Sequence, residues 1–343
     1  MNPPPPPFAL PSLVWVNPPS HQELTARAGY LEVKSGDADH AHRWFCHNCG
    51  HENQPKNLLV NLQPLGCSGC GEQNPTSFVW SIIESVVNEI ELDLVIRDQG
   101  DHRTCTAHAL IAGMDLKRRT YGALFGLYVP QELDIRDLLM KFFWRFGEVL
   151  GHEKTRDLIS HRIHCLMSIA QVEGVGYENA SAMVPDVYPV APLGRVLKVA
   201  ACFFVTKDMV DRIVRLLAGG FPLVTAVPTG RCFRYVAAGQ IYNAPSIPQN
   251  HAVLLIGFGT APWPGDDFAQ QNSAVTANWP TDPTTGDKRL RTFYRARGSS
   301  GDLQHPDYQL DGFGGDFDIW AEDIHEVLWG FNLTEDIPWC LCP

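Results

Sequence analysis

Three residues of this 343-residue chain have the types needed for acyl transfer through a thiol: Gln99, Cys105 and His251. A thiol can attack a carbonyl carbon, an imidazole can take its proton, and an amide N–H can donate to the developing oxyanion. Cys105 opens a run that predicts a helix, and the positive end of the helix dipole favours a thiolate there. Taken singly, a cysteine or a histidine in an apolar run is more often a packed core residue.

Two Cys-x-x-Cys pairs, each followed by glycine and separated by 17 residues, precede this region. They comprise Cys46, Cys49, Cys67 and Cys70. Four thiolates at this spacing predict a closed, tetrahedral, structural Zn²⁺ site. The surrounding segment is loop-rich and has no core of its own, so a metal is the expected source of its stability.

The apolar pattern predicts helices first and strands second. Helices are predicted over residues 105–118, 131–146, 157–172 and 207–218, the last stopped by Gly219 and Gly220. Strands are predicted over residues 223–227, 252–256 and 293–294, between Pro- and Gly-rich turns. This order favours an α+β fold in two lobes.

The chain divides into three predicted parts. Residues 1–39 are a Pro-rich tail and lead-in, residues 40–77 the zinc module, and residues 78–343 the main domain. Residues 1–19 carry eight prolines, which favour an extended polyproline II segment. Such a segment serves either as a tail or as a ligand for a proline-recognising domain.

The net charge of −11 argues against a general binder of nucleic acid or anionic membranes, since either favours a basic surface. No apolar run reaches the roughly 18 residues that span a bilayer. The N-terminus lacks the basic start and apolar core of a secretory signal, and paired cysteines suit metal binding in a reducing compartment. We therefore expect a cytoplasmic or nuclear protein with no membrane segment.

Residues of about 88–330 resemble the papain-like cysteine peptidases. The pattern Gln-Gly-x-x-x-x-Cys of that family occurs at Gln99 and Cys105, and its Asn-His-Ala-Val-x-x-x-Gly-x-Gly strand occurs at 250–259. The resemblance implies a helical lobe and a β-barrel lobe with a cleft between them. It also implies that Cys105 attacks a peptide carbonyl, that His251 exchanges protons and that Gln99 supports the oxyanion. The implied substrates are peptides or proteins.

The chain departs from this family after the histidine strand. The family has Asn-Ser-Trp-Gly, in which asparagine orients the imidazole and tryptophan shields it, whereas Gly298 and Ser300 stand at those positions. Asn278 and Trp279 are candidates to replace them. Around the nucleophile, the family's two aromatic residues and its disulfide cysteine are replaced, by Thr106, His108 and His102 respectively.

Two functions are therefore open. One is a peptidase impaired by the missing asparagine, and the other is an inactive homologue that binds peptides or proteins as a scaffold.

The zinc module itself has two candidate types. The residues Trp44, Cys46, Cys49 and Asn53 resemble the Ran-binding-protein type of zinc finger, whose members bind single-stranded RNA or ubiquitin; a generic zinc ribbon is the alternative. A protein partner is expected at this module or at the Pro-rich tail.

Overall fold

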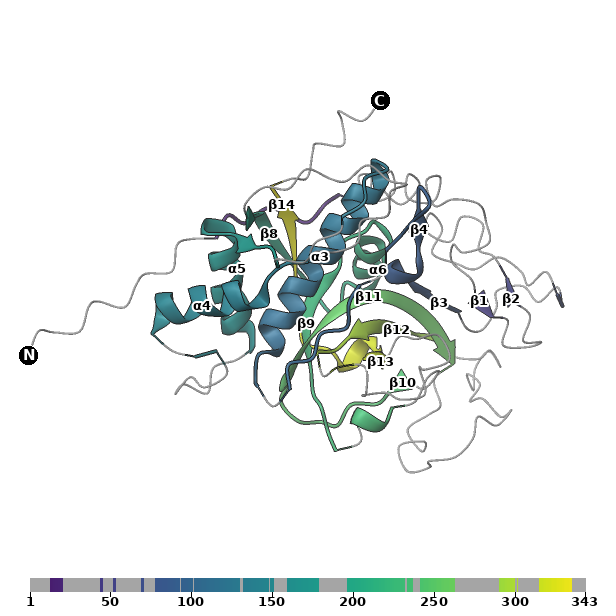
Figure 1. Ribbon diagram of the computed structural model, residues 1–343. Helices are drawn as coiled ribbons and strands as arrows, with labels where there is room; N and C mark the ends of the chain where they lie inside the picture. The colour runs from purple at the N-terminus through teal and green to yellow at the C-terminus, as the bar shows by residue number, and fades with distance from the viewer. Residues whose placement is uncertain are drawn as a thin grey trace, which may run out of the picture.

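A curved sheet of eight strands forms the centre of the molecule (Figure 1). The computed structural model describes residues 13–20, 44–45, 52–53, 69–70, 78–92, 94–100, 102–129, 132–147, 149–150, 159–178, 196–231, 233–236, 241–262, 290–299, 301 and 315–334. In spatial order the strands are β10 (Ile241–Tyr242), β13 (Asp316–Trp320), β12 (Leu290–Arg297), β11 (His251–Pro262), β9 (Leu223–Val227), β14 (Val327–Leu333) and β8 (Val199–Thr206). The eighth strand, β3 (Phe78–Ser81), pairs with β11; among the described strand pairs of this sheet, β10 and β13 run parallel and the others antiparallel.

Strand β11 is the axis of this sheet because it changes partners along its length. Its first half pairs with β9, starting with His251 opposite Val227, and its second half pairs with β3. The pairing with β12 is irregular between Leu255 and Gly257. A Cβ on Gly257 would lie 2.2 Å from the Trp80 carbonyl oxygen, so glycine is required for β3 to approach. His251 thus begins a strand that is held on both sides.

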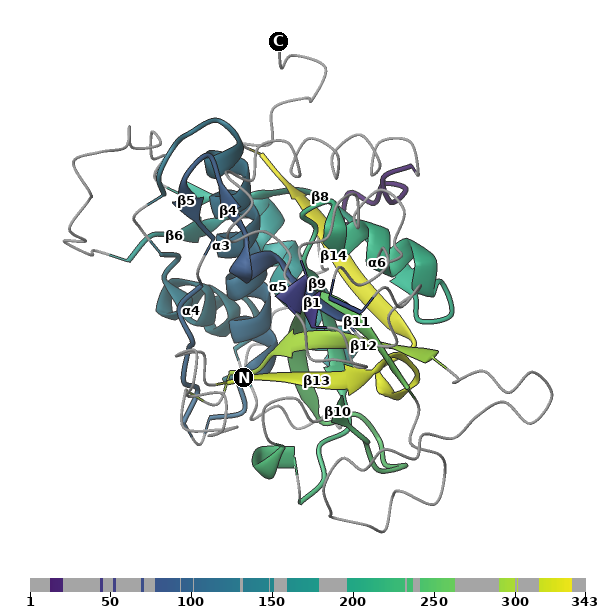
Figure 2. The same ribbon diagram turned by 90° about the vertical axis from the view of Figure 1, so that its right-hand side faces the viewer.

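Of the described helices, α3 (Cys105–Leu124), α5 (Ile159–Val172) and α6 (Val210–Ala218) pack on the sheet, and α4 (Ile135–Phe146) packs on α3 and α5. Helix α3 packs against β11, β9, α4 and α5, which is why nearly all of its residues are buried. Figure 2 shows α3, α4 and α5 on one side of β9 and β14, with α6 on the other.

Local sequence signals set the ends of two of these helices. The Asp134 carboxylate accepts a hydrogen bond of 2.8 Å from the Arg136 backbone N–H, which caps the start of α4. Gly147 ends α4 in the left-handed conformation, with its N–H donating to the Phe143 carbonyl. Helix α6 ends at Gly219, as predicted.

The remaining elements are short. They are β1 (Trp44–Phe45) with β2 (Glu52–Asn53), β4 (Val86–Val87) with β5 (Ile90–Glu91), β6 (Val175–Gly176) with β7 (Val196–Leu197), and 3-10 turns at Ile82–Glu84, Phe233–Tyr235 and Ala321–Asp323. None of the described helices is long and apolar enough to cross a membrane.

Residues 13–20 of the predicted tail lie against the outer edge of β8. Cys202 donates to the Val14 carbonyl and accepts from the Val16 N–H, both at 2.9 Å, which makes a parallel bridge opposite Trp15. Leu13 is buried, and Arg212 donates to the Pro18 and Pro19 carbonyls. This part of the Pro-rich region therefore extends the sheet by one short segment.

The predicted α+β class is confirmed, and each predicted helix and strand has an observed counterpart. The helix predicted over residues 105–118 continues to Leu124. Strands β8, β13 and β14 were not predicted. Among the described strands, the sheet is an open path from β10 to β8, without the pairing between its ends that would close a barrel.

Candidate active site

The fold brings the predicted thiol and imidazole to one place, where the start of α3 packs across the start of β11. Cys105 is the first residue of α3 and His251 the first of β11. The backbone of Ala252, the residue after His251, hydrogen-bonds to the Cys105 sulfur. The packing of helix against strand therefore sets the relation between the two side chains.

Burial has the largest effect on the pKa of the Cys105 thiol. The thiol is only 5% exposed, and burial raises its pKa above that of a free cysteine. The hydrogen bond from Ala252 and the positive charge of Arg162 oppose this effect and are weaker. Desolvation of the sulfur therefore outweighs the neighbouring groups that favour a thiolate at this position.

Gln99 is fixed by Ser299. The Gln99 N–H donates to the Ser299 carbonyl at 2.7 Å, and the Ser299 hydroxyl donates to Gln99 Oε1 at 2.8 Å. Gly100 follows in the left-handed conformation and donates to Asp98 Oδ1 at 2.8 Å, which turns the chain towards Cys105. Since Ser299 engages the amide oxygen, the amide nitrogen is the group that Gln99 presents as a donor.

Gly298 lies beside the imidazole of His251. A Cβ at this position would be 4.0 Å from His251 Nε2 and 3.3 Å from the Gly315 carbonyl oxygen. The position aligned with the family's orienting asparagine is therefore next to the imidazole, but it carries no side chain. Ser300, Asn278 and Trp279 lie outside the described residues.

Phe233 contacts His251 and was not predicted from the sequence. Its ring centroid lies 5.8 Å from that of His251, and it makes T-shaped contacts with the rings of Tyr242 and Phe317. The 3-10 turn Phe233–Tyr235, which precedes β10 in the chain, thus places an aromatic ring against the imidazole. No spacing motif links residues 233 and 251, so only the tertiary structure shows this contact.

His108 lies one helical turn after Cys105 on α3 and was not predicted as a site residue. It lines a gap of about 10 Å³ together with Ala252, Gly298 and Ser299. Its pKa is lowered to about 4, first by burial and then by the charge of Arg97. The imidazole of His108 is therefore neutral at neutral pH.

A larger cavity of about 880 Å³ adjoins Gln99. Its lining runs from the Gln99 loop across to the start of α4, and it also includes His108. The charged lining comprises Asp98, Asp134 and Glu178 against Arg136. Neither Cys105 nor His251 lines this cavity, so it lies to one side of the thiol.

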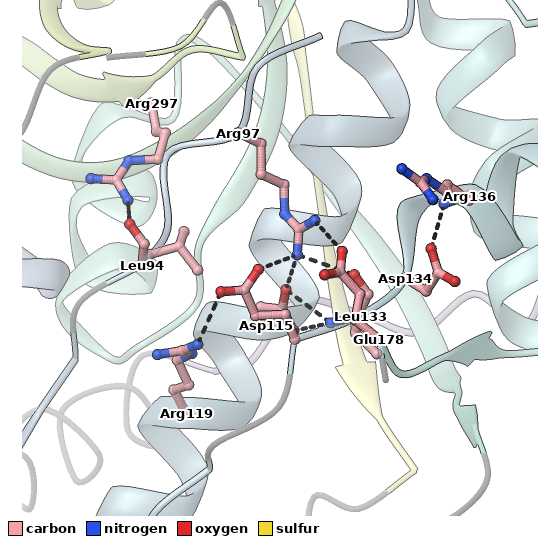
Figure 3. Close-up of polar contacts among 10 residues, drawn as sticks. Leu94, Arg97, Asp115, Arg119, Leu133, Asp134, Arg136, Glu178 and Arg297 are labelled. Atoms are coloured by element: carbon pink, nitrogen blue, oxygen red, sulfur yellow. Dashed lines mark hydrogen bonds and ion pairs between the residues drawn. The ribbon is translucent and has the colours of Figure 1, made fainter. Parts of the chain in front are cut away.

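Two arginines, the partly buried Arg97 and the buried Arg297, hold the segment that leads to Gln99 (Figure 3). Arg97 Nη2 donates to Asp115 at 3.0 Å, to Glu132 at 3.1 Å and to the Leu133 carbonyl at 3.1 Å. Arg297 donates to the Leu94 carbonyl and, through two hydrogen bonds of 2.7 and 2.8 Å, to Asp316. The segment is thereby tied to α3, to the lead-in to α4 and to the sheet.

Asp115 is the buried partner at the centre of this network. Burial raises the pKa of its carboxyl to about 6, while Arg97 and Arg119 act in the opposite direction. A raised pKa in the folded state means that stability from this group is present at low pH and is lost as pH rises through about 6. Arg97 limits that loss because it stabilises the carboxylate.

The zinc module stays a prediction. Cys46, Cys49 and Cys67 lie outside the described residues, and Cys70 is exposed. Within the described ranges, no group of three or more His, Cys, Asp or Glu side chains is arranged to hold a metal ion. The antiparallel pair β1 and β2 flanks the first cysteine pair, with Trp44 opposite Asn53.

Comparisons with known proteins give only distant structural similarity. No protein-family model matches the sequence, and no curated protein matches it. A ragweed pollen allergen, the cysteine protease Amb a 11 in its proform, shares 14% identity and a TM-score of 0.41, over 69% of this chain and 60% of that chain. Procathepsin B S9 of Trypanosoma congolense shares 11% identity and a TM-score of 0.44, over 70% of this chain and 72% of that chain. SERA5E of Plasmodium falciparum shares 14% identity and a TM-score of 0.39, over 71% of this chain and 91% of that chain. This chain thus spans less than two thirds of the ragweed protein.

Replacing Arg97 with methionine should destabilise the fold and make its stability more dependent on pH. Breaking a buried ion pair from one side costs about 3–5 kcal/mol, because Asp115 stays buried without its cation. The loss should be largest above pH 6 and should shrink towards pH 5, where Asp115 is protonated in both proteins. Urea unfolding at pH 5 and pH 7.5 measures this.

The matched control is Arg136→Met, since Arg136 is an exposed arginine in the same region, next to Asp134 (Figure 3). We expect it to change the free energy of unfolding by less than about 0.5 kcal/mol. Equal effects of the two substitutions, or an Arg97→Met loss that does not change with pH, would contradict the role assigned to the Arg97–Asp115 pair.

Proposed function

We propose that this protein is a papain-like cysteine peptidase that hydrolyses peptide bonds through Cys105. The observation that supports this most directly is the junction of α3 and β11, where the sulfur of Cys105 meets the backbone next to His251. The sequence order of Gln99, Cys105 and His251 and the contact of Gln99 with Ser299 are consistent with the same site.

In the proposed mechanism His251 acts as a general base. As the neutral Cys105 sulfur attacks the substrate carbonyl, its proton passes to the His251 imidazole. The carbonyl oxygen becomes an oxyanion, which the Gln99 amide and the Cys105 backbone N–H stabilise. The C–N bond then breaks, the amine leaves with the proton from His251, and a thioester remains. Water, deprotonated by His251, hydrolyses the thioester and restores the thiol.

The cavity beside Gln99 supports a peptide or protein as the substrate. At about 880 Å³ it has room for more than one side chain, and it opens next to the proposed oxyanion donor. Its lining carries more carboxylates than cations, which favours substrates with basic side chains at this subsite.

A second candidate function is an inactive homologue that binds peptides or proteins. Two observations favour it: the glycine at position 298 and the raised pKa of Cys105. Both lower the rate of acyl transfer, while neither affects the cavity beside Gln99. The two functions differ in turnover, which the following experiment measures.

Cys105→Ala should abolish peptide hydrolysis. Loss of the nucleophile costs about 10⁴-fold or more in kcat in other proteases. Hydrolysis of a fluorogenic peptide library by the wild-type protein and by the variant measures the effect. Cys165→Ala is the control, because Cys165 is also buried and helical but lies on α5. Library turnover by the wild type that is unchanged in Cys105→Ala, or no turnover at all, would contradict the peptidase proposal.

Gly298→Asn should raise kcat. An asparagine Cβ at 4.0 Å from His251 Nε2 places its amide within hydrogen-bonding reach of the ring, although the Gly315 carbonyl must shift by a few tenths of an ångström. An orienting residue is worth up to about 10⁴-fold in an unrelated serine protease, and we expect a gain of about tenfold here.

Gly298→Ala is the matched control, because it adds the Cβ without the amide. It should leave kcat unchanged or lower it. A gain from alanine equal to that from asparagine would show that the effect is one of packing and would remove the argument for an orienting hydrogen bond.

We propose further that residues 40–77 bind one structural Zn²⁺ through Cys46, Cys49, Cys67 and Cys70, as a docking module for a protein partner. Metal analysis of freshly purified protein should find close to one Zn²⁺ per chain. Cys46→Ser or Cys67→Ser should lose it, whereas Cys105→Ala should retain it. Absence of zinc from the wild type would contradict the module.

A further inference from the structure

The outer edge of the sheet is covered by part of the Pro-rich region, residues 13–16. Strand β8 is the last strand in the described order of the sheet, and β14 pairs with its inner side. On its outer side the Cys202 N–H donates to the Val14 carbonyl, and the Val16 N–H donates to the Cys202 carbonyl, both at 2.9 Å. Figure 2 shows this segment, in purple, beside β8. Both backbone groups of Cys202, in the middle of β8, are therefore engaged.

Helices α5 and α6 hold the same segment in place. The Gln171 side chain of α5 accepts a hydrogen bond from the Val14 N–H at 2.9 Å and donates to the Ala200 carbonyl of β8 at 3.0 Å. Arg212 of α6 donates to two carbonyls just after the segment, at 3.0 and 3.2 Å. Leu13 is 6% exposed and packs in the core. The segment is thus bound through its backbone, through one buried side chain and by two helices.

The sequence of β8 explains why its edge needs a cover. Residues 199–206 read Val-Ala-Ala-Cys-Phe-Phe-Val-Thr and contain no charge, proline or glycine. An uncharged strand rich in β-branched and aromatic residues pairs readily with another strand when its edge is open. Phe204 adds an apolar ring at this edge, because its side chain is 54% exposed. Strand β8 itself therefore has neither the charges nor the proline that oppose such pairing in edge strands.

The covering segment is bounded by the prolines that β8 lacks. Pro11 precedes it in the sequence, and Pro18 and Pro19 follow it. Proline has no N–H to donate, so strand pairing does not extend through these positions. The segment is therefore long enough to cover the middle of β8 and too short to serve as an edge for a further strand.

We propose that residues 13–16 are an intramolecular cover that prevents β8 from pairing with β8 of a second copy of this chain. When the segment leaves, two β8 strands can pair antiparallel about a twofold axis, because such a pair of identical strands is self-complementary. A second copy is the expected partner, since the edge carries no charge that would select a different strand, and the bound segment shows that an apolar extended strand fits here. This inference is independent of the proposed peptidase function.

The test is the self-association of full-length Val16→Pro, measured by light scattering after size-exclusion chromatography. The substitution removes the N–H that donates to Cys202 and none of the groups that contact Gln171. We expect the segment to leave β8 about fivefold more often, which is the effect of one lost hydrogen bond, and the amides of β8 to exchange with deuterium faster by the same factor. Because both copies must open before they pair, the dissociation constant of the dimer should fall by the square, about 25-fold.

Asn17→Pro is the matched control, because Asn17 is exposed and makes no hydrogen bond to β8 among the described residues. It should change neither amide exchange nor dimerisation by more than about twofold. Phe204→Lys, added to Val16→Pro, should return the protein to the monomer while exchange in β8 stays fast, because a lysine on an edge strand opposes strand pairing.

Unchanged exchange in Val16→Pro would show that the segment does not control this edge, and faster exchange without dimer formation would show that the open edge does not self-pair; either result overturns the proposal. Association that Phe204→Lys leaves in place would point to general unfolding and would overturn it too. A Val16→Pro protein that stays monomeric but binds a synthetic peptide of residues 12–17 would assign the edge to a strand of another protein and exclude the second copy.

Discussion

The site depends on one short segment, residues 94–99, that the guanidinium groups of Arg97 and Arg297 tie to the rest of the molecule. Arg297 joins it to the sheet, through Leu94 and Asp316, and Arg97 joins it to α3 through Asp115. Buried ion pairs add little net stability, but separating the partners is costly. They therefore exclude arrangements in which helix and sheet slide against each other. The position of Gln99, at the end of the segment, is therefore fixed relative to both α3 and the sheet.

The ion pair of Arg297 also fixes the backbone that lies beside the His251 imidazole. Arg297 is followed directly by Gly298 and Ser299, so the side chain that holds Leu94 also fixes the backbone beside His251. The hydrogen bond from Ser299 to Gln99 links the oxyanion donor to this backbone. The donor, the backbone beside the base and the helix of the thiol are thus connected by hydrogen bonds and buried ion pairs that cross between helix and sheet.

The sequence predicts those parts of the fold whose signal is local. The helix at Cys105 and the strand at His251 follow from apolar spacing, and the family motifs give their order. Strand β13 was not predicted because Asp316 and Asp318 resemble loop residues; they are buried only because Arg297 and Arg295 face them from β12. The pKa of Cys105 also depends on tertiary packing, since the helix dipole is a local effect whereas desolvation arises from burial in the folded chain.

Phe233 shows where sequence motifs stop being informative. The motif resemblance identifies a missing orienting residue by its position after the histidine strand, but the structure places an aromatic ring against the imidazole from another segment. Because Cys105 opens α3 and His251 opens β11, the relation of thiol to imidazole depends on how α3 packs against β11. That packing is a tertiary property of the two elements, which no spacing between motif residues encodes.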